Sequence, residues 1–351
     1  MYVIKRTNKY KQKDLELKYF IRDRKYVPQT YVFNTIKNID SYFNQAYITQ
    51  VQEFIDTLPD VSKEYHTFPI PKHSGGVRII TAPNDDLKEQ QTKLLRLMQK
   101  LQPLTHNSAY AYIKGRECKD ALAVHQANQS KYMLKIDLKN FFPSCNKEFV
   151  IKQMKKVHPY YFMDNLEELL DICFLDNVLP QGAPTSPYLS NILMVEFDYK
   201  INKKLWRYNG KHFVYTRYAD DIHISCTDNF NYQEIINVIN EILKETPLTI
   251  NKEKIRYGST GGKNWNLGLI LNKENNITVG HARKHRLKNM LYNFMRDYSN
   301  GTIWELSELQ HLQGELAYVK HIEPKYVQQF IDKHYPLFYN NIKAAINIYN
   351  G

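Results

Sequence analysis

Residues 215–225 read YTRYADDIHIS, and two adjacent aspartates, Asp220 and Asp221, stand at the centre of this stretch. Runs of β-branched and aromatic residues flank them at 213–215 and 222–224, which predicts a hairpin with the acids at its turn. Neighbouring carboxylates repel each other and are costly to hold together. Mg²⁺ would offset this cost, because proteins bind it through one or two carboxylates together with substrate phosphates. A solvated Asp-Asp turn is the alternative.

A third carboxylate, Asp137, follows a short apolar strand predicted at 132–136, within YMLKIDLKNFFP (132–143). In a two-metal phosphoryl-transfer site, acids from separate strands converge on two ions about 4 Å apart. One ion helps to generate the attacking 3′-oxyanion, and the other holds the triphosphate and the leaving oxygen. Together with the paired aspartates, Asp137 completes the three carboxylates that such a site needs. Taken alone, it also fits a helix N-cap or a turn.

Between these acids lies LPQGAPTSPYLSN (179–191), in which prolines and a glycine constrain the backbone. A helical pattern begins at about Ser186, with Pro187 in its first turn. One interpretation is a backbone that passes close to a base or sugar, with Gln181 as the contacting side chain. The other is an ordinary entry into a helix.

Taken in chain order, the three segments resemble the palm motifs of reverse transcriptases. The resemblance implies an α+β, right-hand polymerase fold with fingers, a palm built on an antiparallel sheet, and a helical thumb. Asp137 matches the first metal ligand, and Tyr218 to Asp221 match the paired-aspartate turn. Gln181 and Gly182 match the segment that contacts the template–nucleotide pair. The implied cofactor is a pair of Mg²⁺ ions, with Mn²⁺ as a substitute.

A second hairpin is predicted around a Gly-Gly turn, between FPIPK (68–72) and VRII (77–80), and a helical stretch follows at 87–101. In reverse transcriptases the matching hairpin belongs to the fingers and folds over the incoming deoxynucleoside triphosphate (dNTP). Lys72 and Arg78 would then bind the triphosphate, a task suited to bidentate Arg. A surface hairpin with two solvated cations is the alternative.

The resemblance assigns two further substrate contacts. Phe142 lies where the family carries a bulky gate beneath the sugar, which would make the enzyme prefer deoxynucleotides; a buried core Phe is the alternative. Lys254 is the candidate for a lysine that protonates the leaving pyrophosphate, with Lys252 as the alternative.

Towards the C-terminus, 265–270 resembles the short hairpin that grips the primer end and includes Gly268. Leucines and a valine recur at helical spacing from Leu306 to Val319. The segment LQGELAY (312–318) resembles a thumb helix in which Gly314 allows close approach to the duplex; a core helix of another all-α module is the alternative. The expected division is a helical, basic extension (1–60), fingers (61–130 with 144–180), palm (131–143 and 181–270) and thumb (271–351).

The chain has 351 residues and a formal net charge of +12, which favours a polyanionic partner. One basic cluster lies in residues 1–30. Another lies in 252–288 and includes Arg283, Lys284, Arg286 and Lys288. A groove lined in this way would follow a phosphate backbone, whereas solvated helix faces are the alternative. The 27 tyrosines suit base stacking, or they reflect an AT-rich genome.

The four cysteines are far apart, and neither a zinc pattern nor a secretory signal or membrane span is evident. We therefore expect free thiols in a bacterial cytoplasm and no membrane partner.

The wording QGAPTSP resembles retrons, group II introns and bacterial defence-associated enzymes. Two retron elements are incomplete here. Only His125 remains of the Asn-Ala-x-x-His element, and only Gly268 of the Val-Thr-Gly element. The resemblance therefore favours a defence-associated reverse transcriptase that makes DNA from its own structured non-coding RNA during phage infection, with an effector or partner protein from the same locus.

Two other functions remain open on the same fold. One is a template-independent or protein-primed DNA polymerase that uses a Tyr or Ser hydroxyl as primer. The other is a non-catalytic RNA-binding scaffold. The intact acids argue against the scaffold, because carboxylates without metal would be an electrostatic liability in a basic groove.

Overall fold

The computed structural model describes residues 41–58, 64–71, 76–100, 105–156, 160, 163–206, 208–261, 264–266 and 268–350. Lys72 and residues 1–40 of the expected helical, basic extension lie outside the described residues. The chain divides into two compact units, Met1–Glu117 with Leu134–Tyr257, and Cys118–Met133 with Gly258–Gly351. None of the helices in the described ranges combines the length and the apolar character needed to cross a membrane.

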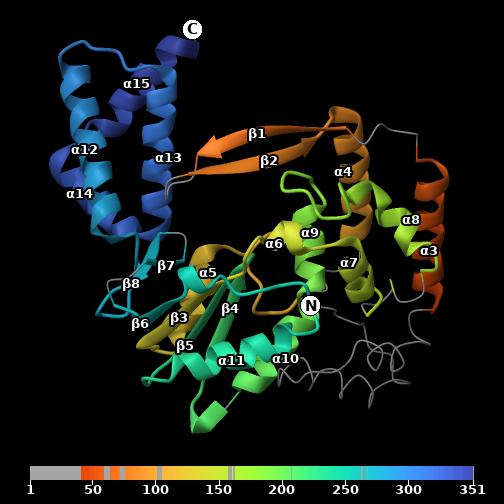
Figure 1. Ribbon diagram of the computed structural model, residues 1–351. Coiled ribbons are helices and arrows are strands. Elements are labelled where there is room, and N and C mark those ends of the chain that lie inside the picture. The colour runs from red at the N-terminus through yellow and green to blue at the C-terminus, as the bar shows by residue number, and fades with distance from the viewer. Residues whose placement is uncertain are drawn as a thin grey trace. The chain divides into compact units, whose positions relative to one another are not determined.

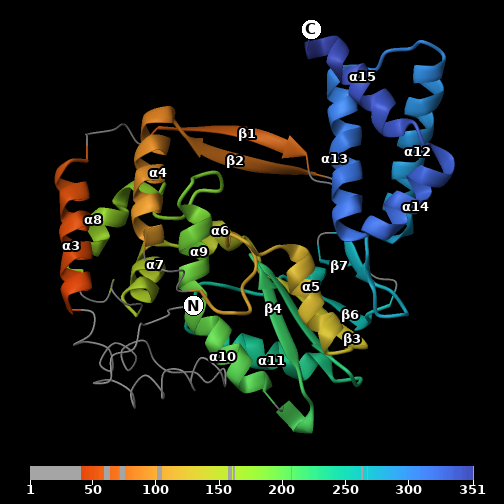
Figure 2. The same ribbon diagram turned by 180° about the vertical axis from the view of Figure 1, so that it is seen from behind.

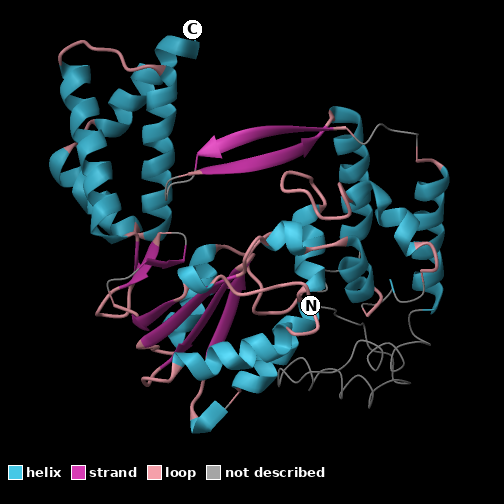
Figure 3. Ribbon diagram, viewed as in Figure 1, coloured by secondary structure: helices cyan, strands magenta, loops and turns pink. Residues whose placement is uncertain are grey.

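The first unit combines helices with two antiparallel hairpins (Figures 1 and 3). Its helices are α3 (Ser41–Asp56), α4 (Asp85–Lys100), α6 (Phe141–Ser144), α7 (Lys147–Met154), α8 (Leu166–Leu170), α9 (Ser186–Leu193), α10 (Val195–Leu205) and α11 (Tyr232–Leu243). Short 3-10 turns are η3 (Asp171–Cys173), η4 (Tyr208–Gly210) and η5 (Lys252–Lys254). Its strands are β1 (Tyr65–Pro71), β2 (Val77–Pro83), β4 (Val214–Tyr218) and β5 (Asp221–Cys226), and the boundary between the units runs through β3 (Tyr132–Asp137) and β6 (Arg256–Ser259).

The paired aspartates lie at a tight hairpin turn, as the sequence predicts. β4 pairs antiparallel with β5, and the register closes with Tyr218 opposite Asp221. This leaves Ala219 and Asp220 as the two turn residues, with a φ of 56° at Ala219. A left-handed φ is costly for a residue with a Cβ atom, so neighbouring contacts must hold the turn in place.

A four-stranded sheet carries this hairpin, with strand order β4-β5-β3-β6. Apolar side chains alternate on β5, where Ile222 and Ile224 are fully buried. α11 is amphipathic, with buried isoleucines at 235, 236, 239 and 242. Figures 1 and 2 show α10 and α11 lying side by side along the sheet.

The predicted fingers hairpin is present as β1 and β2, which pair antiparallel from Tyr65 opposite Pro83 to Pro71 opposite Val77. Helix α4 follows it directly. Two apolar residues at the start of β2 are exposed, since Val77 and Ile79 show more than half of their surface.

The loop before α9 is joined to this hairpin. The Thr81 amide donates to the Gln181 carbonyl at 2.9 Å. Gly182 has a φ of 146°, and a Cβ atom added there would lie 2.6 Å from the Thr81 carbonyl oxygen. The glycine therefore permits the loop to approach β2. Helix α9 begins at Ser186 with Pro187 in its first turn, as predicted.

The second unit contains a small sheet and a helical bundle. Strands β7 (Asn264–Asn266), β8 (Leu269–Leu271) and β9 (Ile277–Thr278) form an antiparallel sheet, which includes the hairpin predicted at 265–270. The helices are α5 (Cys118–Ala127), α12 (Gly280–Ser299), α13 (Leu306–Ile322), α14 (Pro324–His334) and α15 (Phe338–Asn350). The leucines predicted to share one face of α13, Leu309, Leu312 and Leu316, are buried in the core of this unit.

A buried ion pair holds the aspartate hairpin to α10. The Arg217 guanidinium, on β4, donates to both carboxylate oxygens of Asp198 at 2.8 Å. Both side chains are fully buried. Arg217 also donates to the Asn191 side chain and to the Ala219 carbonyl, each at 3.1 Å. The last bond supports the strained turn directly.

We predict that Arg217→Met lowers the free energy of unfolding by about 3–5 kcal/mol, because it leaves the Asp198 charge buried without its partner. Urea denaturation measures this loss. Lys200→Met is the matched control, since Lys200 forms partly exposed ion pairs with Glu196 and Glu245. It should cost less than about 1 kcal/mol. Equal losses in the two variants would contradict the role assigned to the buried pair.

Candidate active site

The three predicted carboxylates gather at one end of the four-stranded sheet. Asp137 is the last residue of β3, which is next to β5 in the sheet. The Leu138 amide donates to the Asp220 carbonyl at 3.2 Å, so the backbone after Asp137 is bonded directly to the aspartate turn. Asp137 is 7% exposed, and Asp220 and Asp221 are half-buried. The fold thus unites acids that lie more than eighty positions apart in the sequence.

Two lysines neutralise two of these acids. Lys254 Nζ donates to Asp137 Oδ1 at 2.5 Å, and Lys135 Nζ donates to Asp221 Oδ2 at 2.7 Å. Hydrogen bonding to Asp137 raises the pKa of Lys254 above its ordinary value. The Lys254 ammonium therefore stays charged and bonded to a carboxylate at neutral pH.

Lys254 reaches the site because 249–251 lies against the end of β3. The Asn251 amide donates to the Asp137 carbonyl at 2.8 Å, and η5 follows at once. Of the two lysines in η5 considered from the sequence, Lys254 is the one bonded to an acid, while Lys252 is exposed. Lys135 was missed by the sequence reasoning. Its signal is strand alternation, because Lys135 and Asp137 are two residues apart and point to the same face of β3.

Asp220 has the most perturbed carboxyl group of the three. Its pKa is raised from 3.8 to about 6, chiefly by burial and then by the charges of Asp221 and Asp137, while a backbone hydrogen bond and the charge of Lys254 lower it. Like charges that crowd a half-buried group in this way favour any cation that can enter.

The donor chemistry fits Mg²⁺, which prefers carboxylate oxygens. Across the described residues, no three acidic, His or Cys side chains are already close enough together to hold an ion. At this site Asp137 and Asp221 point to lysines instead of to a common centre. The carboxylates therefore suit a divalent ion once the lysines give way, and the raised pKa of Asp220 is the observation that supports this fit.

The other expected substrate contacts in this unit lie on three segments. Arg78 is exposed on β2, opposite Ile70. Phe142 is half-buried on α6 and contacts Phe141 edge-on, with ring centroids 5.6 Å apart; Phe141 is the buried member of this pair. Tyr218 is half-buried at the end of β4, and Gln181 is half-buried in the loop before α9.

The second unit carries the residues expected to contact nucleic acid. Arg283 forms a bidentate pair with Glu315 at 2.9 Å and lies over the Tyr318 ring, and Lys284 pairs with Glu323 at 2.6 Å. These two cations thus join α12 to neighbouring helices.

Arg286 and Lys288 are exposed on α12, with Lys288 above the Phe330 ring. Gly268 has a φ of 92° before β8. Gly314 lies in α13, and a Cβ atom added there would meet nothing within 4 Å.

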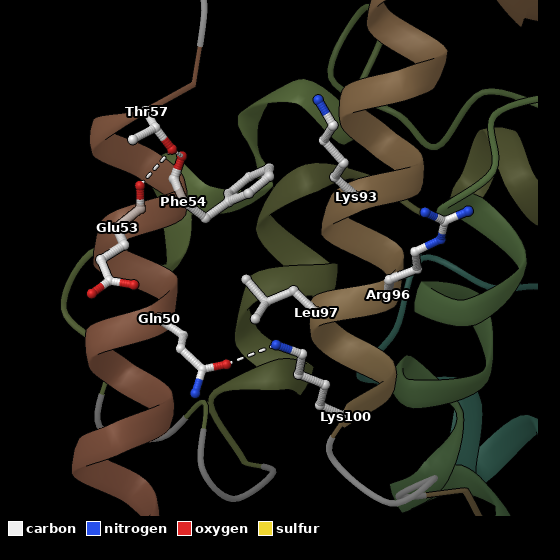
Figure 4. Close-up of a pocket in the computed structure, with 8 residues that line it drawn as sticks. All are labelled: Gln50, Glu53, Phe54, Thr57, Lys93, Arg96, Leu97 and Lys100. Atoms are coloured by element: carbon white, nitrogen blue, oxygen red, sulfur yellow. Dashed lines mark hydrogen bonds between the residues drawn. The ribbon is translucent and has the colours of Figure 1, made fainter.

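A groove between α3 and α4 is separate from these residues (Figure 4). Its lining includes Lys93, Arg96 and Lys100, and Lys100 donates to Gln50 across the groove at 2.8 Å. None of the residues expected to bind substrate lines it.

We predict that Asp220→Asn stabilises the protein in the absence of divalent ions by about 2 kcal/mol at pH 8. The folded-state pKa of Asp220 lies above its ordinary value, so ionisation is unfavourable in the folded state. This penalty is absent below about pH 4, grows up to about pH 6 and is complete above it. The gain should therefore vanish near pH 4. Chemical denaturation across this pH range measures it, and a gain that does not depend on pH would contradict the assignment.

We predict that Gly182→Ala destabilises the protein by about 1–3 kcal/mol, because the new Cβ atom meets the Thr81 carbonyl and the φ of 146° is strained for alanine. Gly314→Ala is the matched control. It lies in open space within a helix and should stabilise by about 0.5–1 kcal/mol. Thermal melting compares the two, and a stable Gly182→Ala protein would show that the approach to β2 is not tight.

Residues 70–288 match the family model described as reverse transcriptase (RNA-dependent DNA polymerase). The chain is 27% identical over 285 residues to the Retron Ec83 reverse transcriptase of Escherichia coli, which covers 77% of this chain and 86% of that protein. It is 31% identical over 291 residues to the Retron Ec73 reverse transcriptase of Escherichia coli, which covers 80% of this chain and 89% of that protein.

A third relative, the Retron Mx65 reverse transcriptase of Myxococcus xanthus, is 31% identical over 292 residues, with 78% of this chain and 65% of that protein covered. Among solved structures, apo telomerase from Candida Tropicalis has a TM-score of 0.45 and 14% identity, over 87% of this chain and 66% of that one, and we base no conclusion on a likeness at this level. The family model spans more than half of the chain, and the mixed helix and antiparallel-sheet architecture agrees with it. The chain therefore belongs to the reverse transcriptase family, with a right-hand polymerase fold and RNA-directed DNA polymerase activity.

Proposed function

We propose that this protein copies a cognate non-coding RNA into DNA by two-metal nucleotidyl transfer, in bacterial defence against phage. The observation that carries the proposal is the gathering of Asp137, Asp220 and Asp221 at one end of the sheet, with Lys254 bonded to the first of them. Similarity to retron reverse transcriptases supports the choice of template.

Asp137, Asp220 and Asp221 are the residues that would hold two Mg²⁺ ions. When bound, such ions supply a nucleophilic 3′-oxyanion and neutralise charge on the triphosphate. The acids of the chain provide the anionic ligands. Lys135 and Lys254 compensate those acids before ions arrive, so the site stays assembled in spite of its like charges.

The substrate contacts follow from the same site. Arg78, with Lys72, binds the triphosphate. Phe142 excludes a ribose 2′-hydroxyl, and Gln181 and Gly182 position the base pair that forms. Tyr218 borders the acids, and Lys254 donates a proton to the leaving pyrophosphate. Its position supports this last role, because it is charged, bonded to an acid and still 63% exposed at the side chain.

The RNA–DNA duplex would be held by the C-terminal part of the chain. We assign the fingers to 61–130 with 144–180, the palm to 131–143 and 181–270, and the thumb to 271–351, after a basic extension at 1–60. Gly268 would lie near the primer end. Arg286 and Lys288 are exposed cations suited to phosphates, and Gly314 leaves open space on α13. Arg283 and Lys284 would act through the ion pairs that fix α12.

We predict that Asp137→Asn, Asp220→Asn and Asp221→Asn each reduce DNA synthesis by at least about a thousandfold, because each removes a metal ligand. Incorporation of labelled dNTP on an annealed RNA template measures this, in Mg²⁺ or Mn²⁺. Asp228→Asn, which alters an exposed acid in the same unit, is the control and should retain activity. Retained synthesis by Asp220→Asn would refute the metal assignment.

The template and the defence role need the native locus. Wild-type protein and an Asp220→Asn, Asp221→Asn double variant are purified from cells that carry the flanking genes, and their bound RNA and DNA are sequenced before and after phage infection. We expect the same RNA in both samples, with complementary DNA and phage resistance only for the wild type. DNA without a matching RNA would favour the template-independent alternative instead. Label that stays attached to protein after nuclease treatment would favour protein priming.

A further inference from the structure

The loop between α4 and α5 is built around a single arginine. Arg116 Nη1 donates to three carbonyl oxygens of the same loop, those of His106, Asn107 and Ala109, at 3.4, 3.2 and 2.6 Å. Its guanidinium also lies over the Tyr110 ring, 5.5 Å from the centroid. These bonds fix the path of the loop within its own sequence.

The same loop is paired with the strand that leads to the paired aspartates. The Arg217 amide donates to the Ser108 carbonyl at 2.7 Å, and the Tyr110 amide donates to the Arg217 carbonyl at 2.9 Å. Ala109 and Arg217 accordingly form a parallel bridge. The loop therefore extends the sheet beyond β4 by one short pairing.

A buried hydrogen-bond chain then connects the residue before Tyr112 with the residue before Asp220. The Asn191 side chain donates to the Ala111 carbonyl at 2.7 Å and accepts from Arg217, which donates to the Ala219 carbonyl. Asn191, Arg217, Ala111 and Ala219 are all buried. The position of Tyr112 relative to the acid turn is thus determined by buried groups and not by a surface loop.

Tyr112 itself combines an unfavourable backbone conformation with an exposed side chain. Its φ is 60°, a left-handed conformation that is a genuine outlier for a bulky residue. Its side chain is nevertheless 49% exposed, so burial of the ring does not compensate for the strain. Strain of this kind persists where the surroundings over-determine it, and it clusters at ligand-binding sites.

The hydrogen-bond chain places Tyr112 near the aspartate turn, and the charges that act on its hydroxyl agree with this position. Burial raises the pKa of its hydroxyl, and the charge of Asp220 raises it further, while Arg78 lowers it. The Tyr112 hydroxyl is therefore close enough to interact electrostatically with an acid of the candidate metal site and with the arginine proposed to bind the triphosphate. Under the proposed function both groups act on the incoming nucleotide, the acid through the bound ions and Arg78 on the triphosphate.

We propose that Tyr112 is a substrate-contacting residue whose ring packs against the nucleoside of the incoming dNTP. This inference rests on the proposed function and adds a nucleotide contact that the sequence motifs do not contain. An exposed aromatic ring suits this role because every base presents a π-face, and stacking of this kind tolerates all four bases. The strained backbone holds the ring in place before the nucleotide arrives, which reduces the ordering cost of binding.

Tyr112→Gly tests the proposal, because glycine relieves the strain and removes the ring in one step. We expect the thermal midpoint to stay the same or to rise, while the Kd for dNTP in single-turnover incorporation rises about tenfold or more. Tyr112→Phe retains the ring and should bind dNTP within about threefold of the wild type. Asn209→Gly is the control. It replaces another left-handed residue of the same unit, with a φ of 50°, and should leave the Kd for dNTP unchanged.

A second readout is independent of synthesis. The fluorescence of 2-aminopurine deoxyriboside triphosphate, titrated with protein and a chain-terminated RNA–DNA hybrid, should be quenched by wild type and by Tyr112→Phe, and much less by Tyr112→Gly. Unchanged dNTP affinity in Tyr112→Gly, or a loss confined to hybrid binding, would overturn the proposal. If the aspartate variants kept activity while Tyr112→Gly lost dNTP affinity, the proposed metal site would fail and this contact would remain.

Discussion

The buried pair between Arg217 and Asp198 is the constraint on which the end of the sheet that carries the three acids depends. A guanidinium without any exposed surface is tolerable only when its charge is paired and its N–H groups are satisfied. Arg217 meets this demand by reaching α10, α9 and the aspartate turn at once. The turn is left-handed at Ala219, so it depends on these bonds. Moving any one of the segments would leave a buried donor or a buried charge without its partner.

Electrostatics at the acids follow from this rigidity. The backbone does not let the three carboxylates separate freely, and burial together with their mutual repulsion raises the pKa of Asp220. Two ammonium groups, on Lys135 and Lys254, relieve part of it. A divalent ion that enters would have to displace these groups, because Asp137 and Asp221 point to the lysines and not to a common centre. The lysines therefore keep the acids together at the expense of metal affinity.

Local signals in the sequence were enough to predict both hairpins, the strand that ends at Asp137, and the helix that begins at Ser186. In each case the turn residues or the periodicity lie within a few positions of one another. The partners of Arg217 and Arg283 were not predictable in this way. Asp198 and Glu315 are charged residues on helices, where single-sequence reasoning expects solvent. The left-handed Tyr112 has no sequence signal at all, because that conformation usually selects glycine or asparagine.

The hydrogen bond between Thr81 and Gln181 attaches the first hairpin to the loop before α9 at one point. From Thr81 to Val77 the strand runs four residues, or about 14 Å at the usual rise per residue. A rotation of roughly 10° about this bond would then move the Val77 end of β2 by about 2.5 Å, by the same strand geometry. Arg78 lies next to Val77 at the far end of the strand, whereas Gly182 lies beside Thr81. A change in the angle of β2 about this bond would therefore displace Arg78 more than it displaces Gly182.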